Sequence, residues 1–257
     1  MLNRRTLLKA LPLGLAGTTF SLSFSSLIAA VAGEKNSEWN YEAPEDWGEL
    51  SEEYKACQIG RQQSPIDLQT SIESTLKPIE FSYGEIPLRI INNGHTIQVN
   101  SNPGNYLIID NEKFELLQFH FHHPSEHTIK GQNYPLELHL VHQNQQGYLA
   151  VLGIFLKQGQ ENASLKPVWD AMPSQKSPEK LIRDVQISLA NLLPAESNRY
   201  HYFGSLTTPP CSEIVNWVVF QNPLEISVAQ INQFHQIFPV NARPTQPINR
   251  RFLLGSN

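Results

Sequence analysis

The stretch QFHFHHPSEH, residues 118–127, alternates polar and aromatic side chains. Successive side chains of a β-strand point to opposite faces of the sheet. The two phenylalanines therefore share one face, and the other face carries Gln118, His120 and His122. We expect the phenylalanines to be buried and the imidazoles on the opposite face to converge.

Short apolar or alternating runs of this kind recur along the chain and are separated by Asn-Gly, Pro and Gly. The expected strands are IEFSY (79–83), LRIINNGHTIQVN (88–100), NYLIID (105–110), EKFELLQFHFHH (112–123), PLELHLVHQN (135–144), GYLAVLGIFLK (147–157), HYFGSL (201–206) and EIVNWVVF (213–220). The pattern predicts a mainly β protein with a few peripheral short helices. Neither a repeat nor a Gly/Ser-rich linker divides these strands, which indicates one domain.

Two segments carry helical signals. In SVAQINQFHQIF (227–238), Ser227 and Gln230 form a capping-box pattern ahead of apolar residues at helical spacing. SPEKLIRDVQISLANLLP (177–194) begins like a helix, with Ser177 as N-cap, but its Val-Gln-Ile-Ser portion is equally compatible with a strand. Residues 34–60 are expected to form an irregular arm whose aromatic side chains pack on the domain: Trp39, Tyr41 and Trp47.

The first 32 residues are typical of an export signal, because three basic residues (Arg4, Arg5 and Lys9) and no acidic ones precede an apolar run. The paired arginines indicate the twin-arginine type, and Ala-Val-Ala at 30–32 offers a cleavage site. We expect residues 33–257 to form the exported domain, periplasmic or extracellular, with no stable membrane anchor. The alternative is an uncleaved anchor; the Gly, Pro, Ser and Thr residues within the run argue against it.

Charge and cysteine content narrow the function further. Without the three basic residues of the signal, 16 of the 19 Lys and Arg residues remain, against 24 Asp and Glu residues. The formal charge is therefore 16 − 24 = −8. An acidic domain of this kind is not expected to bind nucleic acid. Only two cysteines are present, Cys57 and Cys211, and an oxidising compartment favours a disulfide between them. The alternative is a pair of buried free thiols.

Six of the nine histidines fall between His120 and His142. His139, in LELHLVH (136–142), occupies a second predicted strand that could lie beside the first. Three neutral imidazoles suit Zn²⁺, and three protein ligands leave its fourth position open, as in catalytic sites. The pattern therefore predicts a catalytic zinc site.

Two polar residues precede these histidines by two positions, Gln118 before His120 and Glu137 before His139. Each shares a face with its histidine, so each can hold the second imidazole nitrogen, as metal-ligating histidines require. The alternative is that both are polar residues on a solvated strand face. We expect the remaining histidines of the strand region and beyond to be surface or packed residues: His123, His127, His142, His201 and His235.

Several separated motifs resemble the alpha-class carbonic anhydrases. They are QFHFHHPSEH, LELHLVHQN, LAVLGIFL, GSLTTPPCSE and RPTQPINRR, and the similarity runs from about Trp39 to Arg251. The bacterial members are also similar in their two-cysteine pattern. The resemblance implies a twisted, mostly antiparallel sheet of about ten strands and a zinc ion in a conical cavity. It implies zinc ligation by His120, His122 and His139, supported from behind by Gln118 and Glu137.

The resemblance also implies roles for residues around the metal. Thr207 matches the threonine that orients the zinc hydroxide, Glu126 matches its carboxylate partner, and His95 matches the proton-shuttle histidine. The apolar wall that holds carbon dioxide corresponds to Val141, Val151, Leu206, Val215 and Trp217, with Thr208 also lining the substrate site. The cavity water network corresponds to Tyr41, Asn93 and Thr208, whereas Gln98 stands where many members have Asn.

The implied activity is the reversible, zinc-dependent hydration of carbon dioxide to bicarbonate and a proton by zinc-bound hydroxide. Small anions and sulfonamides are the implied inhibitors. Two further departures from the animal members are His123, which replaces an aromatic residue, and the short Pro124-Ser125 link to Glu126. The alternatives are a catalytically silent scaffold, which usually lacks a zinc histidine, a zinc esterase, and a carbohydrate-binding β-sandwich, which does not explain the combined His, Gln, Glu and Thr set.

Overall fold

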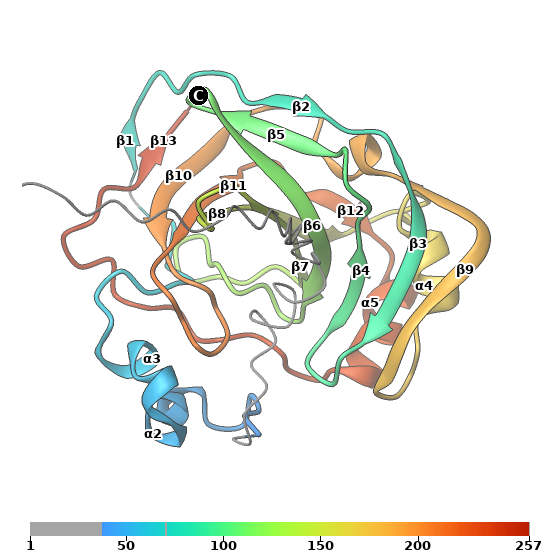
Figure 1. The fold of residues 1–257 in the computed structure, drawn as a ribbon, viewed down its shortest axis with the longest axis horizontal. Helices are drawn as coiled ribbons and strands as arrows, with labels where there is room; N and C mark the ends of the chain where they lie inside the picture. Colours follow the sequence, from blue (N-terminus) through green and yellow to red (C-terminus); the bar gives the residue numbers. More distant parts are fainter. Residues whose placement is uncertain (1–37, 70, 257) are drawn as a thin grey trace, which may run out of the picture. The chain divides into compact units, whose positions relative to one another are not determined.

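The computed structural model describes residues 38–69 and 71–256. Within these ranges one sheet contains 13 strands, and ten of them form a continuous path in the order β1-β13-β10-β11-β8-β7-β6-β4-β3-β9 (Figure 1). β5 pairs with β6 and β2, and β12 pairs with β8. The predicted export signal lies outside the described residues.

The strands are β1 (Ile72–Glu73), β2 (Glu80–Ser82), β3 (Glu85–Asn92), β4 (Ile97–Asn100), β5 (Tyr106–Ile109), β6 (Glu112–His122), β7 (Leu136–Gln143), β8 (Leu149–Gln158), β9 (Ser177–Ser188), β10 (Arg199–Gly204), β11 (Val215–Phe220), β12 (Leu224–Ile226) and β13 (Leu254–Gly255). The α-helices are α2 (Trp47–Leu50), α3 (Ala56–Ile59), α4 (Lys166–Ala171) and α5 (Val228–Ile237). Three 3₁₀ turns are η1 (Pro44–Asp46), η2 (Glu52–Tyr54) and η3 (Leu189–Leu192).

Most neighbouring strands are antiparallel, and the parallel pairs are β1 with β13, β8 with β11, and β8 with β12. The predicted mainly β fold with short helices is therefore confirmed. Every residue of β8 from Leu149 to Leu156 is buried, as expected for a strand covered on both faces. Strands β7 and β8 thus form a rigid support in the middle of the sheet.

The alternation in β6 separates an apolar face from a polar one. Phe119 and Phe121 are 0% exposed and belong to the main hydrophobic core, together with Phe234 from α5 and Trp169 from α4. Burial of aromatic side chains of this size contributes on the order of 2–3 kcal/mol each. This apolar face fixes the strand register, because a shift by one residue would turn the phenylalanines outward.

Helix α5 confirms the predicted capping box. The Ser227 hydroxyl accepts a hydrogen bond from the Gln230 backbone N–H, and the Gln230 side chain accepts one from the Ser227 N–H. Phe234 then points into the core and anchors the helix. Both local capping and the buried residue therefore specify where this helix begins and how it packs.

The helical start predicted at residue 177 is wrong. Residues Ser177–Ser188 form β9, the terminal strand of the path, and η3 follows it. β9 pairs with β3 through an irregular register, with Asp184 in the left-handed region at φ 60°. A proline at position 178 fits here because an edge strand tolerates a missing N–H. Tertiary pairing with β3 has overridden the local capping signal.

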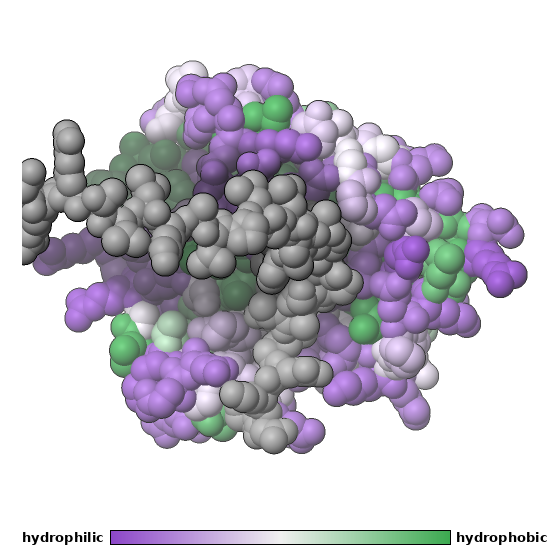
Figure 2. Space-filling model, in the orientation of Figure 1, coloured by the Kyte–Doolittle hydropathy of each residue, from purple (hydrophilic) through white to green (hydrophobic). Residues whose placement is uncertain are grey.

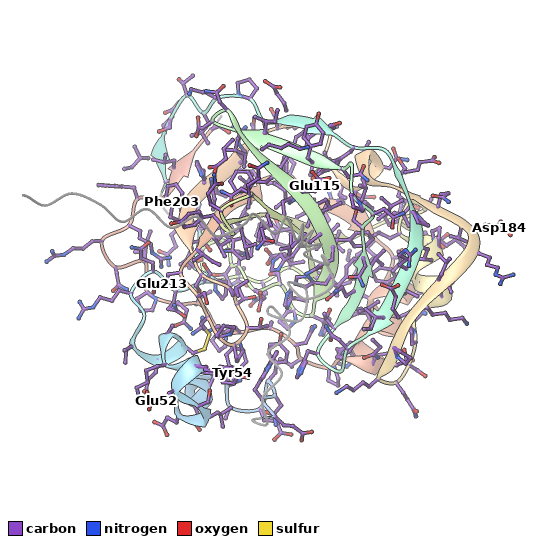
Figure 3. The ribbon with its side chains drawn as sticks, in the orientation of Figure 1. Glu52, Tyr54, Glu115, Asp184, Phe203 and Glu213 are labelled. Carbon is purple, nitrogen blue, oxygen red and sulfur yellow. A yellow bond between two sulfur atoms is a disulfide. The ribbon has the colours of Figure 1, made fainter. Side chains whose placement is uncertain are left out.

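The N-terminal segment packs its aromatic side chains as predicted, although it contains short helical turns that the sequence did not indicate. Trp39 lies 5.1 Å from Trp47 between ring centroids, in an edge-to-face arrangement. Trp47 and Tyr54 are buried around the Cys57–Cys211 disulfide, which confirms the predicted pairing (Figure 3). The disulfide fixes α3 to the loop between β10 and β11.

Most side chains on the face drawn in Figure 2 are hydrophilic, and apolar residues occur there in scattered groups. Across the described part of the chain, the helices are all too short or too polar to cross a membrane.

Candidate metal centre

The three predicted ligands come together at the centre of the sheet. In the antiparallel β6–β7 pair, His120 lies directly opposite His139, and His122 follows two residues along β6 on the same face. The ring centroids are 4.6 to 5.3 Å apart, and one nitrogen from each ring lies within 4.8 Å of the others. His122 and His139 are 1% exposed, while His120 is partly exposed. Strand geometry alone therefore brings the three imidazoles together.

The second nitrogen of each ring has a partner. His120 Nδ1 lies 2.8 Å from Gln118 Oε1, and His139 Nε2 lies 3.0 Å from Glu137 Oε1. His122 Nδ1 lies 2.7 Å from the backbone carbonyl oxygen of Asn241. Carbonyl and carboxylate oxygens only accept hydrogen bonds, so each of these nitrogens carries the proton. The lone pairs left over are those of His120 Nε2, His122 Nε2 and His139 Nδ1.

Glu137 binds more than one histidine. Its Oε1 accepts from His127 Nδ1 at 2.8 Å as well as from His139, and its Oε2 accepts from the backbone N–H groups of Glu126 and His127, each at 2.9 Å. His127, which sequence reasoning left without a role, is 0% exposed and also contacts Tyr202 Oη through Nε2 at 2.7 Å. Its loop position gave no periodicity from which this role could be predicted.

The environment keeps two of the predicted ligand histidines neutral. Burial, followed by the neighbouring imidazoles, lowers the pKa of His120 well below its usual value, and the same causes lower the pKa of His122 to about 3. Although burial alone would raise the pKa of Glu137, its contacts with His127 and His139 hold it well below the usual range. The centre therefore combines neutral imidazoles at His120 and His122 with an ionised carboxylate at Glu137.

Glu126 lies near the imidazole nitrogens that keep a free lone pair, whereas Glu137 contacts the other nitrogen of His139. Its Oε1 accepts from the Arg243 backbone N–H at 2.9 Å, and its Oε2 lies 3.5 Å from His122 Nε2 and 3.9 Å from His139 Nδ1. Burial raises the pKa of this carboxyl to about 7, against the lowering effects of His139 and of hydrogen bonds from Arg243 and Thr207. Thr207 is thus placed beside Glu126, and both are buried.

The donor set fits a divalent metal ion. Within the described ranges, His122 Nε2 and Glu126 Oε2 are buried atoms that lack a hydrogen-bond partner. A buried polar atom without a partner is costly, and a cation bound by the histidine nitrogens would compensate for both atoms. Three neutral imidazoles are the donors of catalytic zinc sites, and each already has its second nitrogen held in place.

An apolar wall lies beside the histidines, formed by residues from the adjacent strands β7, β8 and β11 and from the loop between β10 and β11. The five residues predicted to hold substrate belong to one cluster: Val141, Val151, Leu206, Val215 and Trp217. The indole ring of Trp217 lies 4.9 Å from His139, and its Nε1 donates to the Ser205 carbonyl oxygen at 3.0 Å. The structure therefore places hydrophobic side chains next to the nitrogen cluster.

His95 and Asn93 occupy the turn between β3 and β4. The Asn93 side-chain oxygen accepts from the N–H groups of His95 and Thr96, each at 2.9 Å, which fixes the turn. The His95 ring stacks on Trp39 with centroids 3.8 Å apart. Burial, and then the charge of Lys176, lower the pKa of His95.

The remaining predicted cavity residues differ in their surroundings. Tyr41 lies in the aromatic cluster with Trp39 and Trp47, and burial, followed by the charge of Glu126, raises its pKa well above the usual value. Gln98 lies opposite His120 in the β4–β6 register and donates to the Asn100 side chain. Thr208 is partly exposed and directly follows Thr207.

The fold and this centre define a β-sheet protein whose three-histidine cluster could hold one metal ion. The family described as eukaryotic-type carbonic anhydrase matches residues 42–256. A carbonic anhydrase from Nostoc sp. is 48% identical over 261 residues, which cover 98% of this chain and 97% of the relative. The chain therefore belongs to the eukaryotic-type, or alpha-class, carbonic anhydrase family.

Two solved structures agree with this assignment. An alpha-carbonic anhydrase from Thermovibrio ammonificans, in complex with the inhibitor sulfanilamide, is 42% identical with a TM-score of 0.83 and covers 86% of this chain and 100% of its own. A carbonic anhydrase from Chlamydomonas reinhardtii, in complex with acetazolamide, is 37% identical with a TM-score of 0.75 and covers 85% and 99%. Similarity thus extends over the fold and the sequence together.

Proposed function

We propose that this carbonic anhydrase holds Zn²⁺ through His120 Nε2, His122 Nε2 and His139 Nδ1 and catalyses the reversible hydration of carbon dioxide to bicarbonate. The observation that carries the proposal is the convergence of three nitrogen lone pairs whose rings are each held at the second nitrogen. When bound, zinc lowers the pKa of its water to about 7 and so supplies a hydroxide nucleophile, a value for which the known example is carbonic anhydrase itself.

Thr207 and Glu126 are proposed to orient the attacking oxygen. Glu126 accepts the Thr207 hydroxyl proton, so the Thr207 oxygen is left able only to accept a hydrogen bond. An attacking oxygen that donates its single hydrogen to Thr207 directs a lone pair toward the substrate. The contribution of the pair is therefore orientation, and it is supported by the hydrogen bonds that Glu126 receives from Arg243 and Thr207.

The apolar wall is proposed to hold carbon dioxide beside the histidines. Carbon dioxide is small and uncharged, so hydrophobic contact with Val141, Val151, Leu206, Val215 and Trp217 can bind it weakly. Weak binding of this kind leaves the charged product, bicarbonate, free to depart. An apolar wall offers few polar partners to an ester, so we propose that ester hydrolysis is a minor activity.

His95 is proposed to carry the proton out of the cavity through water ordered by Tyr41, Asn93, Gln98 and Thr208. A histidine that is neutral at neutral pH can accept a proton and pass it to buffer. The position of His95 on a turn fixed by the Asn93 side chain supports this role.

Small anions and sulfonamides are proposed as inhibitors, since the Thermovibrio ammonificans relative binds sulfanilamide. Export to the periplasm or beyond is proposed as well, and the Cys57–Cys211 disulfide supports an oxidising location.

Metal analysis combined with stopped-flow hydration of carbon dioxide tests the proposal. We expect one zinc per chain, activity that disappears on chelation, and recovery when zinc is returned. His120→Ala should lose both zinc and activity, whereas His235→Ala, which removes an exposed histidine on α5, should keep both. Stoichiometric zinc in purified His120→Ala would contradict the ligand assignment, and a zinc-loaded wild-type protein without activity would contradict the function.

A further inference from the structure

A row of polar side chains crosses the sheet from the metal centre to its edge. On β4, Gln98 lies opposite His120 of β6, and Asn100, two residues further along, shares its face. Asn100 lies opposite Arg89 of β3, and the next strand outward, β9, contributes Glu179. The row therefore connects the side chain opposite His120 to the edge strand β9.

Three hydrogen bonds join these side chains in sequence. Arg89 Nη1 donates to Glu179 Oε1 at 3.0 Å, Asn100 Nδ2 donates to Glu179 Oε2 at 2.6 Å, and Gln98 Nε2 donates to Asn100 Oδ1 at 2.6 Å. The orientation of an amide side chain follows from its partners. Because a carboxylate only accepts, Asn100 must turn its NH₂ group toward Glu179 and its oxygen toward Gln98. Gln98 must then turn its NH₂ group toward Asn100.

We propose that Glu179, held by Arg89, orients Asn100 and through it Gln98, so that Gln98 presents its carbonyl oxygen to the water beside His120. Glu179 and Asn100 are positioning residues in this proposal, which rests on the proposed function. A carbonyl oxygen accepts hydrogen bonds from cavity water, whereas an NH₂ group would donate to it and reverse the direction of the water hydrogens. Proton transfer through bridging water depends on that direction.

A substitution that removes the charge of Glu179 should reverse the orientation of both amide side chains in the row. In Glu179→Gln the side chain has one acceptor oxygen, which Arg89 takes, so its NH₂ group faces Asn100. Asn100 then turns its oxygen toward position 179 and its NH₂ group toward Gln98, and Gln98 turns its own NH₂ group into the cavity. Adding Asn100→Asp should restore the native orientation, because an aspartate accepts from position 179 and from Gln98 at the same time.

Stopped-flow kinetics in weak buffer give the first measurement. Proton release follows carbon dioxide conversion, so it affects kcat and not kcat/KM. We expect Glu179→Gln to lower kcat by about threefold to fivefold, the effect of about one net hydrogen bond, and to leave kcat/KM unchanged. The double variant with Asn100→Asp should recover kcat. Glu196→Gln is the matched control, since exposed Glu196 also accepts from an asparagine amide, that of Asn222 at 2.8 Å; it should behave as wild type.

The side-chain amide resonances of Gln98 in zinc-loaded protein give a second measurement that needs no activity. They should shift in Glu179→Gln and return in the double variant. An unchanged kcat and unchanged resonances in Glu179→Gln would overturn the proposal. A parallel fall in kcat and kcat/KM, or a loss that the double variant does not recover, would also overturn it by indicating general damage to the site. A wild-type protein without carbon dioxide hydration activity would instead refute the proposed function. The resonance shifts would still test the orientation of Gln98, because they are measured without activity.

Discussion

His142 should make this protein sensitive to acid, although it lies three residues beyond His139, a proposed zinc ligand. The side chain is 0% exposed in β7, its Nδ1 lies 3.1 Å from the Ala150 carbonyl oxygen, and its Nε2 lies 2.6 Å from Tyr83 Oη. A carbonyl oxygen only accepts, so Nδ1 carries the proton and Nε2 accepts from the Tyr83 hydroxyl. Both nitrogens of the neutral ring are therefore satisfied, and burial lowers the pKa of His142 to about 3.

The sign and size of the effect follow from linkage. The unfolded chain binds a proton at this histidine below a pKa of about 6.5, whereas the folded chain does not bind it until about pH 3. Stability is therefore lost as pH falls from about 6.5 toward 3, and it is unaffected above that window. At pH 5 the loss is about 2 kcal/mol, since each unit of difference between the unfolded pKa and the pH contributes about 1.4 kcal/mol.

Urea unfolding of wild type and His142→Gln at pH 8 and pH 5, followed by tryptophan fluorescence, measures this quantity. Glutamine keeps an acceptor and a donor but does not titrate, so the variant should lose about 2 kcal/mol less than wild type between the two pH values. Any constant destabilisation from altered packing cancels in this comparison. His235→Gln, which removes an exposed histidine, serves as control and should follow wild type. An equal loss in His142→Gln and wild type would refute the reasoning.

Three further predictions concern separate parts of the chain. Replacing both Cys57 and Cys211 by Ser should lower the free energy of unfolding by up to about 5 kcal/mol in the chain-entropy account, because the disulfide closes a loop with a sequence separation of 154. The midpoint of urea unfolding measures this loss, and an unchanged midpoint would count against a stabilising cross-link. Ser227→Ala should cost about 1 kcal/mol by removing the cap bonded to the Gln230 N–H, which thermal unfolding would detect as a lower midpoint. His95→Ala should slow kcat in weak buffer by about tenfold, less than a group touching substrate contributes, and added imidazole should restore it; a rate unchanged in weak buffer would remove His95 from proton transfer.

The sheet and the histidine cluster could be predicted because their signals are local. Alternation in β6 separates Phe119 and Phe121 from the histidines over only a few residues, and the same alternation on β7 selects His139. Pairing of β6 with β7 then sets His120 opposite His139. The helical start expected at Ser177 shows the limit of local signals, because hydrogen bonding to β3 decided the conformation of β9.

The groups that hold the centre together could not be found in this way. The Asn241 carbonyl oxygen and the Arg243 backbone N–H contact His122 and Glu126 from more than a hundred residues away in sequence. Backbone groups carry no residue-type signature, so only the folded chain shows which of them reach the site. His127 lies in the loop after β6, where alternation no longer predicts the direction of a side chain. Thr207 and Glu126 were expected only through resemblance to a family.

Two buried carboxylates lie beside the three histidines and differ in their hydrogen-bond partners. Glu137 accepts four hydrogen bonds, two from the imidazoles of His127 and His139 and two from backbone N–H groups, so its charge is stabilised without metal. Glu126 is equally buried, but its Oε2 faces His122 Nε2 and His139 Nδ1, which are lone-pair nitrogens and cannot donate to it. A cation bound by those nitrogens would use their lone pairs and lie near this carboxylate, which would lower the cost of burying both groups. The two carboxylates therefore differ in their electrostatic environment because of their hydrogen-bond partners, and the sequence places them eleven residues apart on the strand and loop beside the proposed ion site.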